Sequence, residues 1–230
     1  PSAGADTDAI YLSGWIDYVK WMPDYHLVPI SFFNGTMSVP DTPDLSQSES
    51  STVLYWFTGL QNIADRQQLR ILQPVLTFAG PTATQAQDEP AGWSLTSWDC
   101  CPGSAAWYSD PITGFDEGDV LYGEMSRNAA GETYTVTSTI PGVNSTVLTV
   151  ETSNVVFDEA VATLEVYDIA DCAAFPHDEV AFSDMTILDD SGTSFPGGPK
   201  WDVTTGSDCM GETTVIDPLA KITISCDPTA

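Results

Sequence analysis

The sequence predicts an all-β protein, a two-sheet antiparallel β-sandwich, and three observations support this prediction. Short runs rich in Val, Ile, Thr, Tyr, Phe and Trp recur roughly every 10 to 15 residues and end at Gly, Pro, Asn or Asp. No segment shows the sustained 3.6-residue apolar periodicity of an amphipathic helix. About ten such strands without a repeat period favour two packed sheets of the jelly-roll or concanavalin-like type.

The expected strands follow one another along most of the chain. In order they are 53–59, 69–78, 93–98, 120–127, 133–140, 146–152, 162–169, 180–188 and 222–226. A single helical turn is expected within 61–68. The central part is the clearest, because 119–152 reads as three strands joined by the turns NAAGE and PGVN. Between these turns Tyr134 and Val136 alternate with Thr135 and Thr137, which is typical of a strand with one solvated face.

The length of 230 residues, with a mass of 24.7 kDa, fits a single domain over 1–230. We expect an N-terminal extension at 1–30 and a C-terminal hairpin at 205–230. Pro1 is interpreted as a processed terminus, since no signal peptide begins the chain.

The charge balance excludes several partners. The chain has 33 acidic and 6 basic residues, so its formal charge is 6 − 33 = −27. Nucleic acid and anionic membranes require clustered Lys and Arg, and no apolar run approaches the roughly 18 residues of a membrane span. Crowded carboxylates also predict a protein suited to acid, whose stability falls as the pH rises.

Five cysteines leave at least one without an intrachain partner. Cys209 and Cys226 flank the expected C-terminal hairpin and are the favoured pair. Cys172 could pair with Cys100 or Cys101, a vicinal Cys100–Cys101 bridge is a further option, and all five could be free thiols. The sequons at Asn34 and Asn144, the low pI and the cysteines together predict a secreted, glycosylated protein.

Most catalytic constellations are absent from the sequence. His26 and His177 do not accompany a nucleophile motif or a zinc-ligand spacing, so we expect neither a metal nor a cofactor. The acidic turn at 116–119 could bind calcium, but solvated turn acids are the commoner reading. Gln73 and Glu165 stand out because each lies in an apolar strand, where a polar side chain is costly unless it is exposed, paired or functional.

The order of several motifs resembles that of the secreted fungal glutamic peptidases (eqolisins). The motifs are FNGTMSVPDTP, STVLYWFTGL, ILQPVLTF, SLTSWDCCP, DEGDVLYGEMSR, TYTVTSTI, ATLEVYDIADC and EVAFSDMTIL, over 34–188. The resemblance places Gln73 at the catalytic Gln of "ILQ" and Glu165 at the catalytic Glu of "AEWIVEDF". An ungapped alignment of that last motif places Thr163 there instead. Trp56 and Trp98 fall near tryptophans that line the substrate site of the family.

The resemblance implies a monomeric, secreted acid endopeptidase that cleaves polypeptides without a cofactor. Glu165 would activate a water molecule and Gln73 would stabilise the oxyanion. The chain lacks the family's "DGDTC" loop and most of its "WYEWYP" aromatics. These departures leave two alternatives, a carbohydrate-active or carbohydrate-binding jelly-roll protein and a glutamic-peptidase fold without activity.

Overall fold

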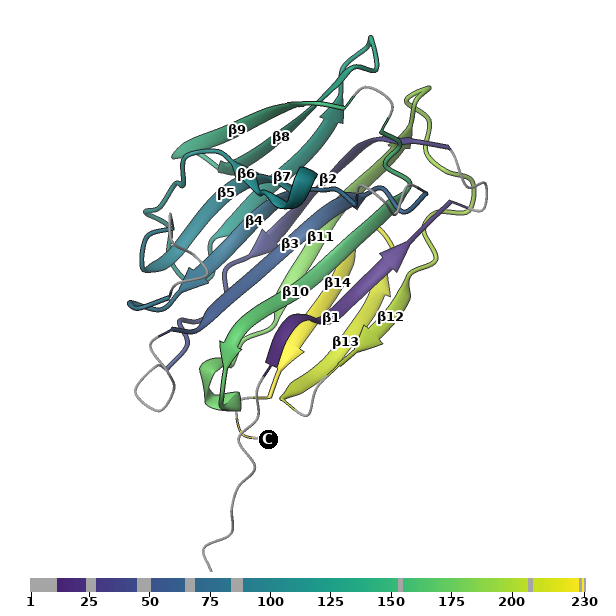
Figure 1. The fold of residues 1–230 in the computed structure, drawn as a ribbon. Helices are drawn as coiled ribbons and strands as arrows, with labels where there is room; N and C mark the ends of the chain where they lie inside the picture. The colour runs from purple at the N-terminus through teal and green to yellow at the C-terminus, as the bar shows by residue number, and fades with distance from the viewer. Residues whose placement is uncertain are drawn as a thin grey trace, which may run out of the picture.

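The structure is a computed structural model, and it describes residues 12–23, 28–44, 51–64, 69–83, 89–152, 155–206, 209–227 and 229. Two antiparallel sheets of seven strands each pack face to face (Figure 1). The predicted all-β sandwich is therefore confirmed. Within the described ranges, no helix is long and apolar enough to span a bilayer.

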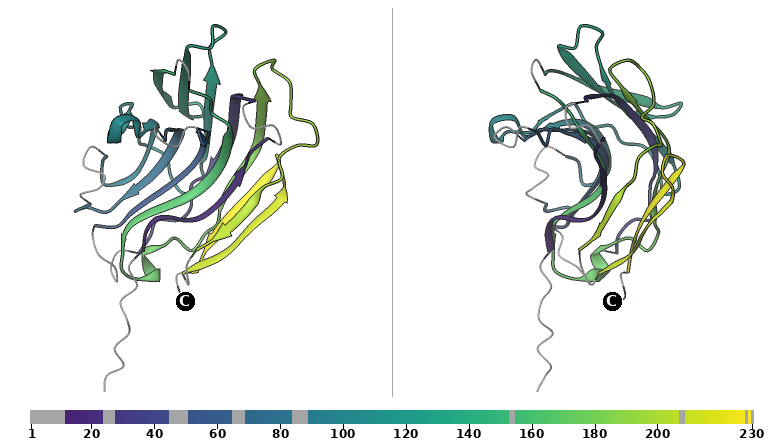
Figure 2. Two further views of the ribbon diagram at one scale, coloured as in Figure 1. Left: turned by 45° about the vertical axis from the view of Figure 1, so that its right-hand side comes forward. Right: turned by 90° about the vertical axis from the view of Figure 1, so that its right-hand side faces the viewer.

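Sheet A is the sheet that carries the predicted site residues. Its strands, in spatial order, are β12 (Asp202–Thr205), β1 (Leu12–Trp21), β10 (Glu159–Ile169), β3 (Val53–Gln61), β4 (Ile71–Ala79), β5 (Gly92–Cys100) and β6 (Trp107–Tyr108). The sheet is strongly curved, and its face turned away from the other sheet is concave (Figure 2). This surface is called the concave face below.

Sheet B packs against the convex side of sheet A. Its order is β13 (Met210–Asp217), β14 (Lys221–Cys226), β11 (Val180–Asp189), β2 (Ile30–Ser38), β7 (Val120–Arg127), β8 (Thr133–Ile140) and β9 (Asn144–Glu151). Among the described residues, short 3₁₀ turns also occur at Pro102–Ser104 and Cys172–Ala174. The three central strands and their two turns occur as the sequence predicts.

Two apolar clusters occupy the two faces of sheet A. The larger cluster lies between the sheets and includes Leu72, Leu76 and Leu164. The smaller cluster lies on the concave face and includes Val75 and Val161. Because side chains alternate along a strand, residues spaced by two from members of one cluster share its face.

The predicted N-terminal extension is in part a strand of the sandwich. Residues 12–21 form β1, which pairs with both β10 and β12 inside sheet A. Two irregularities interrupt its register, between Leu12 and Gly14 and between Trp15 and Asp17. Within the range expected for a C-terminal hairpin, β13 and β14 pair with each other. The strand β12, which ends at the first residue of that range, Thr205, instead pairs with β1 in sheet A. Part of the expected turn at 61–68 lies outside the described residues, and Gln61 itself ends β3.

The disulfide pattern differs from the favoured prediction. Cys209 bonds to Cys172, with a sulfur–sulfur distance of 2.05 Å, and not to Cys226. Cys226 is a buried free thiol, and burial raises its pKa far above the ordinary value. The vicinal bridge between Cys100 and Cys101, one of the open alternatives, is present. The hairpin is thus tied through Cys209 to the 3₁₀ turn that follows β10.

An ion pair within sheet A is linked to sheet B by one further hydrogen bond. The Arg70 guanidinium donates to both carboxylate oxygens of Asp99, at 2.8 and 2.6 Å, and to the backbone carbonyl of Glu151 in β9 at 2.8 Å. Asp99 is almost fully buried. A bidentate pair of this kind fixes both side chains, and removing either partner would leave a buried charge uncompensated.

Candidate active site

Gln73 and Glu165 both lie on the concave face. Gln73 is two residues from Val75 on β4, and Glu165 is four residues from Val161 on β10, so each shares the face of the smaller apolar cluster. The structure therefore places the two predicted catalytic side chains on one surface, although more than ninety residues separate them in the chain.

The strand register nevertheless separates these two residues. Glu165 lies opposite Tyr55 of β3, and Tyr55 lies opposite Thr77 of β4. Gln73 is four residues along β4 from Thr77, a distance of about 13 Å, and β4 is two strands, about 10 Å, from β10. Phe57 and Val75, both fully buried, lie in the row between them. The structure does not bring the Gln73 amide and the Glu165 carboxyl into contact.

The residues of β10 nearest to the level of Gln73 are Val161 and Thr163. Thr163 pairs with Phe57, which pairs with Val75, two residues from Gln73. Thr163 is the alternative position of the family's Glu in an ungapped alignment. Neither Val161 nor Thr163 has a group that exchanges protons in the acid range. The carboxyl groups of β10 that share their side of the strand are those of Glu165 and of Glu159, which is buried opposite Gln61 at the start of the strand.

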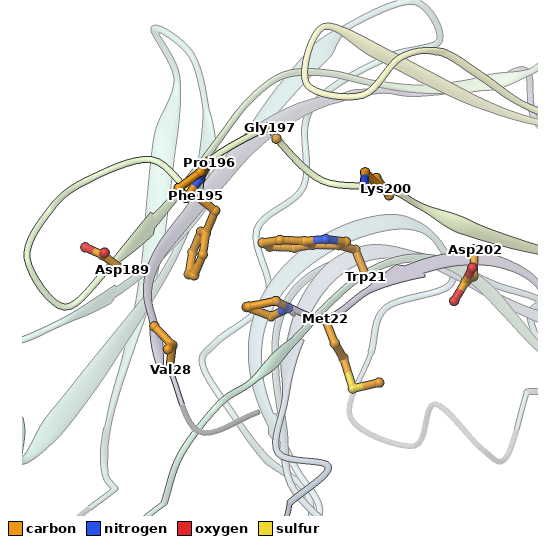
Figure 3. A pocket seen from close by; sticks show the side chains of 11 residues that line it. Trp21, Met22, Val28, Asp189, Phe195, Pro196, Gly197, Lys200 and Asp202 are labelled. Carbon is orange, nitrogen blue, oxygen red and sulfur yellow. The ribbon is translucent and has the colours of Figure 1, made fainter. Parts of the chain in front are cut away.

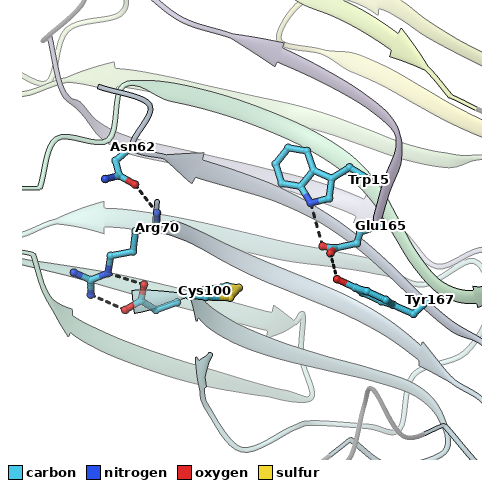
Figure 4. Close-up of a disulfide and its surroundings, with 8 residues drawn as sticks. Trp15, Asn62, Arg70, Cys100, Glu165 and Tyr167 are labelled. Atoms are coloured by element: carbon cyan, nitrogen blue, oxygen red, sulfur yellow. Dashed lines mark hydrogen bonds and ion pairs between the residues drawn. A yellow bond between two sulfur atoms is a disulfide. The ribbon is translucent and has the colours of Figure 1, made fainter. Parts of the chain in front are cut away.

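Two hydrogen bonds orient the Glu165 carboxyl (Figure 4). Oε2 accepts from the Trp15 indole nitrogen at 3.1 Å, and Oε1 accepts from the Tyr167 hydroxyl at 2.5 Å. Burial raises the pKa of Glu165 above its ordinary value, and the two donors offset part of this shift. A carboxyl with this environment is held in one orientation and stays protonated over more of the acid range than an exposed one.

A second carboxylate, which the sequence analysis did not single out, lies on the same face near β5. Glu89 accepts hydrogen bonds from the hydroxyls of Ser94, at 2.5 Å, and Thr96, at 2.7 Å. Tyr55 lies between Glu89 and Glu165. Burial and then the charges of both glutamates raise the pKa of the Tyr55 phenol. No sequence motif marks Glu89, because its position is defined by its contacts with the Ser94 and Thr96 hydroxyls of β5.

Several buried polar atoms of the concave face make no hydrogen bond within the described part of the chain. They are Gln73 Oε1, Trp98 Nε1, Thr77 Oγ1 and Thr163 Oγ1. Gln73 and Trp98 lie directly opposite each other on β4 and β5, so an acceptor and a donor stand side by side. Since buried polar groups are normally paired, such atoms are suited to bind the peptide groups or hydroxyls of a ligand.

The structure separates the two predicted substrate-binding tryptophans. Trp98 lies on the concave face, with its ring 5.4 Å from Tyr55 and 5.5 Å from Tyr108. Trp56 is fully buried in the core between the sheets. Its assignment to the substrate site is therefore corrected, because a side chain on the convex side of sheet A cannot reach a ligand on the concave face.

A cavity of about 610 Å³ opens where the end of β1 meets the β11–β12 connection (Figure 3). Trp21 and Phe195, in edge-to-face contact at 5.1 Å, form part of its apolar wall, and Lys200 lies at its rim. None of the predicted site residues lines this cavity.

The acidic turn at 116–119, considered above as a calcium site, has an internal hydrogen bond in which Asp119 accepts from the backbone nitrogen of Asp116. No group of three or more metal-ligating side chains occurs among the described residues.

Comparison with known protein families finds no match, and neither does comparison with curated proteins. Solved structures do match. Two structures of scytalido-glutamic peptidase with transition-state analogues give TM-scores of 0.64 and 0.63, at 14% identity, covering 94% of this chain and all of theirs. SCP-B, an eqolisin in complex with the tripeptide Ala-Ile-His, gives 0.61 at the same identity and coverage. The chain thus has a fold similar to that of the glutamic peptidases over nearly its whole length.

Proposed function

We propose that this protein is a secreted acid endopeptidase in which Glu165 is the general acid–base. The observation that carries the proposal is the Glu165 carboxyl itself: half-buried, oriented by Trp15 and Tyr167, and set on the concave face of a fold similar to that of glutamic peptidases. The similar structures hold a peptide-based analogue or a tripeptide. We propose a polypeptide substrate for this chain as well.

The proposed reaction needs only a carboxyl group and a water molecule. Ionised Glu165 takes a proton from the water molecule while the water oxygen attacks the peptide carbonyl carbon. Protonated Glu165 then gives that proton to the amide nitrogen as the carbon–nitrogen bond breaks, which releases an amine and a carboxylic acid. A carboxyl can act as the base in acid, where a histidine would already be protonated.

Gln73 is assigned a role in binding the peptide substrate, away from the bond that is cleaved. A dyad would require its amide over the same bond as Glu165, but the strand register separates the two residues by two strands and four positions. An extended peptide rises about 3.3 Å per residue, so one bound segment could contact both side chains. We propose that Gln73 and the adjacent Trp98 hydrogen-bond the substrate backbone away from the cleaved bond.

Replacing Gln73 with alanine separates these two roles. For a backbone-binding residue we expect KM to rise about 5- to 10-fold with kcat nearly unchanged, because one or two hydrogen bonds of uniform binding are lost. An oxyanion donor would instead lower kcat by about 100-fold or more. Steady-state kinetics on one fluorogenic peptide between pH 3 and 6, compared at the pH optimum of the wild type, measures both constants. If Gln73→Ala lowers only kcat, the result would support a catalytic dyad of Gln73 and Glu165 instead.

A second candidate function rests on the aromatic rings of the concave face. Tyr55 lies 5.4 Å from Trp98 and 6.1 Å from Tyr167, so several rings follow one another across the sheet. Sugar-binding proteins use such rings as stacking surfaces. A carbohydrate-active or carbohydrate-binding protein would therefore use the same face with a different ligand.

Parallel assays distinguish the candidates. Casein is incubated with the protein at pH 2 to 4, with and without pepstatin, beside a panel of neutral polysaccharides. Cleavage that resists pepstatin supports the peptidase, since that inhibitor targets paired aspartates. Retention or depolymerisation of a glycan supports the second candidate. If neither occurs, the catalytic proposal is rejected and the fold is that of a protein without this activity.

A further inference from the structure

The two sequons of the chain occupy very different places in the fold. Asn34 lies in the middle of β2, with β11 and β7 on either side of it in sheet B. Its Nδ2 donates to the Tyr122 hydroxyl at 2.9 Å, and its Oδ1 accepts from the Thr186 backbone nitrogen at 3.1 Å. Both ends of this amide are therefore engaged in the outer-face network of a central strand.

Asn144 is exposed and begins β9, one of the two edge strands of sheet B. Its Oδ1 accepts from the Ser145 backbone nitrogen at 2.9 Å, and within the described residues its Nδ2 makes no hydrogen bond. It follows an exposed turn that contains Gly142, whose φ of +78° suits glycine. A substituent on this nitrogen would extend into solvent without displacing any contact.

The surroundings of Asn144 give a physical reason for a bulky polar substituent there. Val143 is 64% exposed and Val147 is 52% exposed, so the start of this edge strand presents apolar side chains to solvent. Exposed apolar edges promote strand-to-strand association unless they are covered or charged. The only charged residue of β9 is Glu151, at the other end of the strand.

We propose that Asn144 carries an N-linked oligosaccharide, that Asn34 carries none, and that the glycan covers the β9 edge. The disulfide between Cys172 and Cys209 fits the oxidising secretory compartment in which this modification occurs. The donor is a lipid diphosphate-linked oligosaccharide. Asn144 Nδ2 loses a proton and bonds to the anomeric carbon of the first sugar, and the lipid diphosphate leaves with the electrons of the broken carbon–oxygen bond. The inference does not depend on the proposed peptidase activity.

The test is site occupancy after expression through a eukaryotic secretory pathway, with the full chain. Intact mass is measured before and after treatment with a peptide N-glycosidase, and peptides containing each Asn are analysed separately. We expect one glycan per chain, on Asn144, and an unmodified Asn34. In Asn144→Gln, an exposed and conservative change, we expect no loss of mass on treatment. A glycan on Asn34, or a wild-type chain without any glycan, would overturn the assignment.

Coverage of the edge is tested on the same material by light scattering. We expect the deglycosylated protein and Asn144→Gln to self-associate at concentrations where the glycosylated protein stays monomeric. Adding Val147→Lys to Asn144→Gln places a charge on the edge strand and is expected to restore the monomer. If the glycosylated and deglycosylated proteins self-associate equally, the glycan does not cover the β9 edge, and that part of the proposal is rejected.

Discussion

Replacing Glu165 with glutamine is expected to lower acid proteolysis at least about 100-fold, the usual contribution of a general acid–base group. Glutamine keeps the shape of the side chain, and its one amide oxygen can still accept from either Trp15 or Tyr167, but it cannot take up a proton from water. The rate is measured on a fluorogenic peptide between pH 2 and 5. Glu124→Gln is the matched control, because Glu124 also accepts from a tyrosine hydroxyl, that of Tyr122, but lies in sheet B.

The dependence of kcat/KM on pH also tests Glu165 as the general base, through the two residues that donate hydrogen bonds to it, Trp15 and Tyr167. Each donor lowers the pKa of Glu165, so Trp15→Phe or Tyr167→Phe should raise it. Because the base must be ionised, the acid limb of kcat/KM should then move to higher pH. Tyr18→Phe, which removes a hydroxyl from a ring beside Trp15, should leave the limb in place. Full activity in Glu165→Gln, with an unchanged thermal melt, would exclude Glu165 as the base.

The predictability of the fold differs from strand to strand for physical reasons. The strands at 120–127 and 133–140 were bounded correctly, because strong turn residues flank them and one face alternates with the other. The strand β1 was missed, since Gly14, Asp17 and Lys20 interrupt its apolar pattern and the register slips twice. Such slips depend on the neighbouring strands, which a local pattern does not report.

The same limit applies to the candidate site. All nine residues of β3 are buried, so its sequence gives no alternation that could assign Trp56 to one face. The roles expected for Gln73 and Glu165 require the two side chains to lie close together, but their separation depends on the register of β10 on β3 and of β3 on β4. Glu89 carries no motif at all. Side-chain type and strand context single out Glu165 as a candidate, whereas its contacts with Trp15 and Tyr167 depend on strand pairing and side-chain packing.

Cysteine pairing was limited in a similar way. Cys226 does lie beside the hairpin partner strand, where it pairs in register with Met210. Cys209, one residue earlier, instead bonds to Cys172 in the 3₁₀ turn after β10. The hairpin pattern could only indicate that Cys209 and Cys226 lie near each other. The disulfide of Cys209 instead depends on how the two sheets pack, which brings it next to Cys172.

Asp17→Asn is expected to raise the melting temperature at pH 7.5 by about 5 °C and to leave it nearly unchanged at pH 3.5. Asp17 is fully buried on β1, and neither carboxyl oxygen makes a hydrogen bond within the described residues. Burial raises its pKa from 3.8 to about 6, and the nearby polar groups of Thr213 and the Tyr18 backbone offset only part of this. The protonated form is therefore the one that the fold accommodates.

The sign of the effect follows from this shift. A folded pKa above the unfolded one gives stability that is complete below about pH 3.8 and is lost as the pH rises through about 6. Glu165 acts in the same direction. Asp189, Asp217 and Asp227, which lie near the surface at strand ends and whose pKa values are lowered by hydrogen bonds, act in the opposite direction. The buried group should dominate, because water screens the exposed ones.

Thermal melts of the wild type and Asp17→Asn from pH 3 to 8 measure this difference, and Asp184→Asn is the control. Asp184 is exposed, and its replacement changes the net charge equally. If general repulsion among carboxylates limited stability at neutral pH, both variants would gain by the same amount. A gain confined to Asp17→Asn, growing through pH 6, would instead assign the loss to one carboxyl between the sheets, beside the buried Cys226 thiol and Thr213 of the C-terminal hairpin. Neutral pH would then open the sandwich first where β1 meets that hairpin, and hydrogen exchange of β13 and β14 should rise there before exchange at the centre of sheet B.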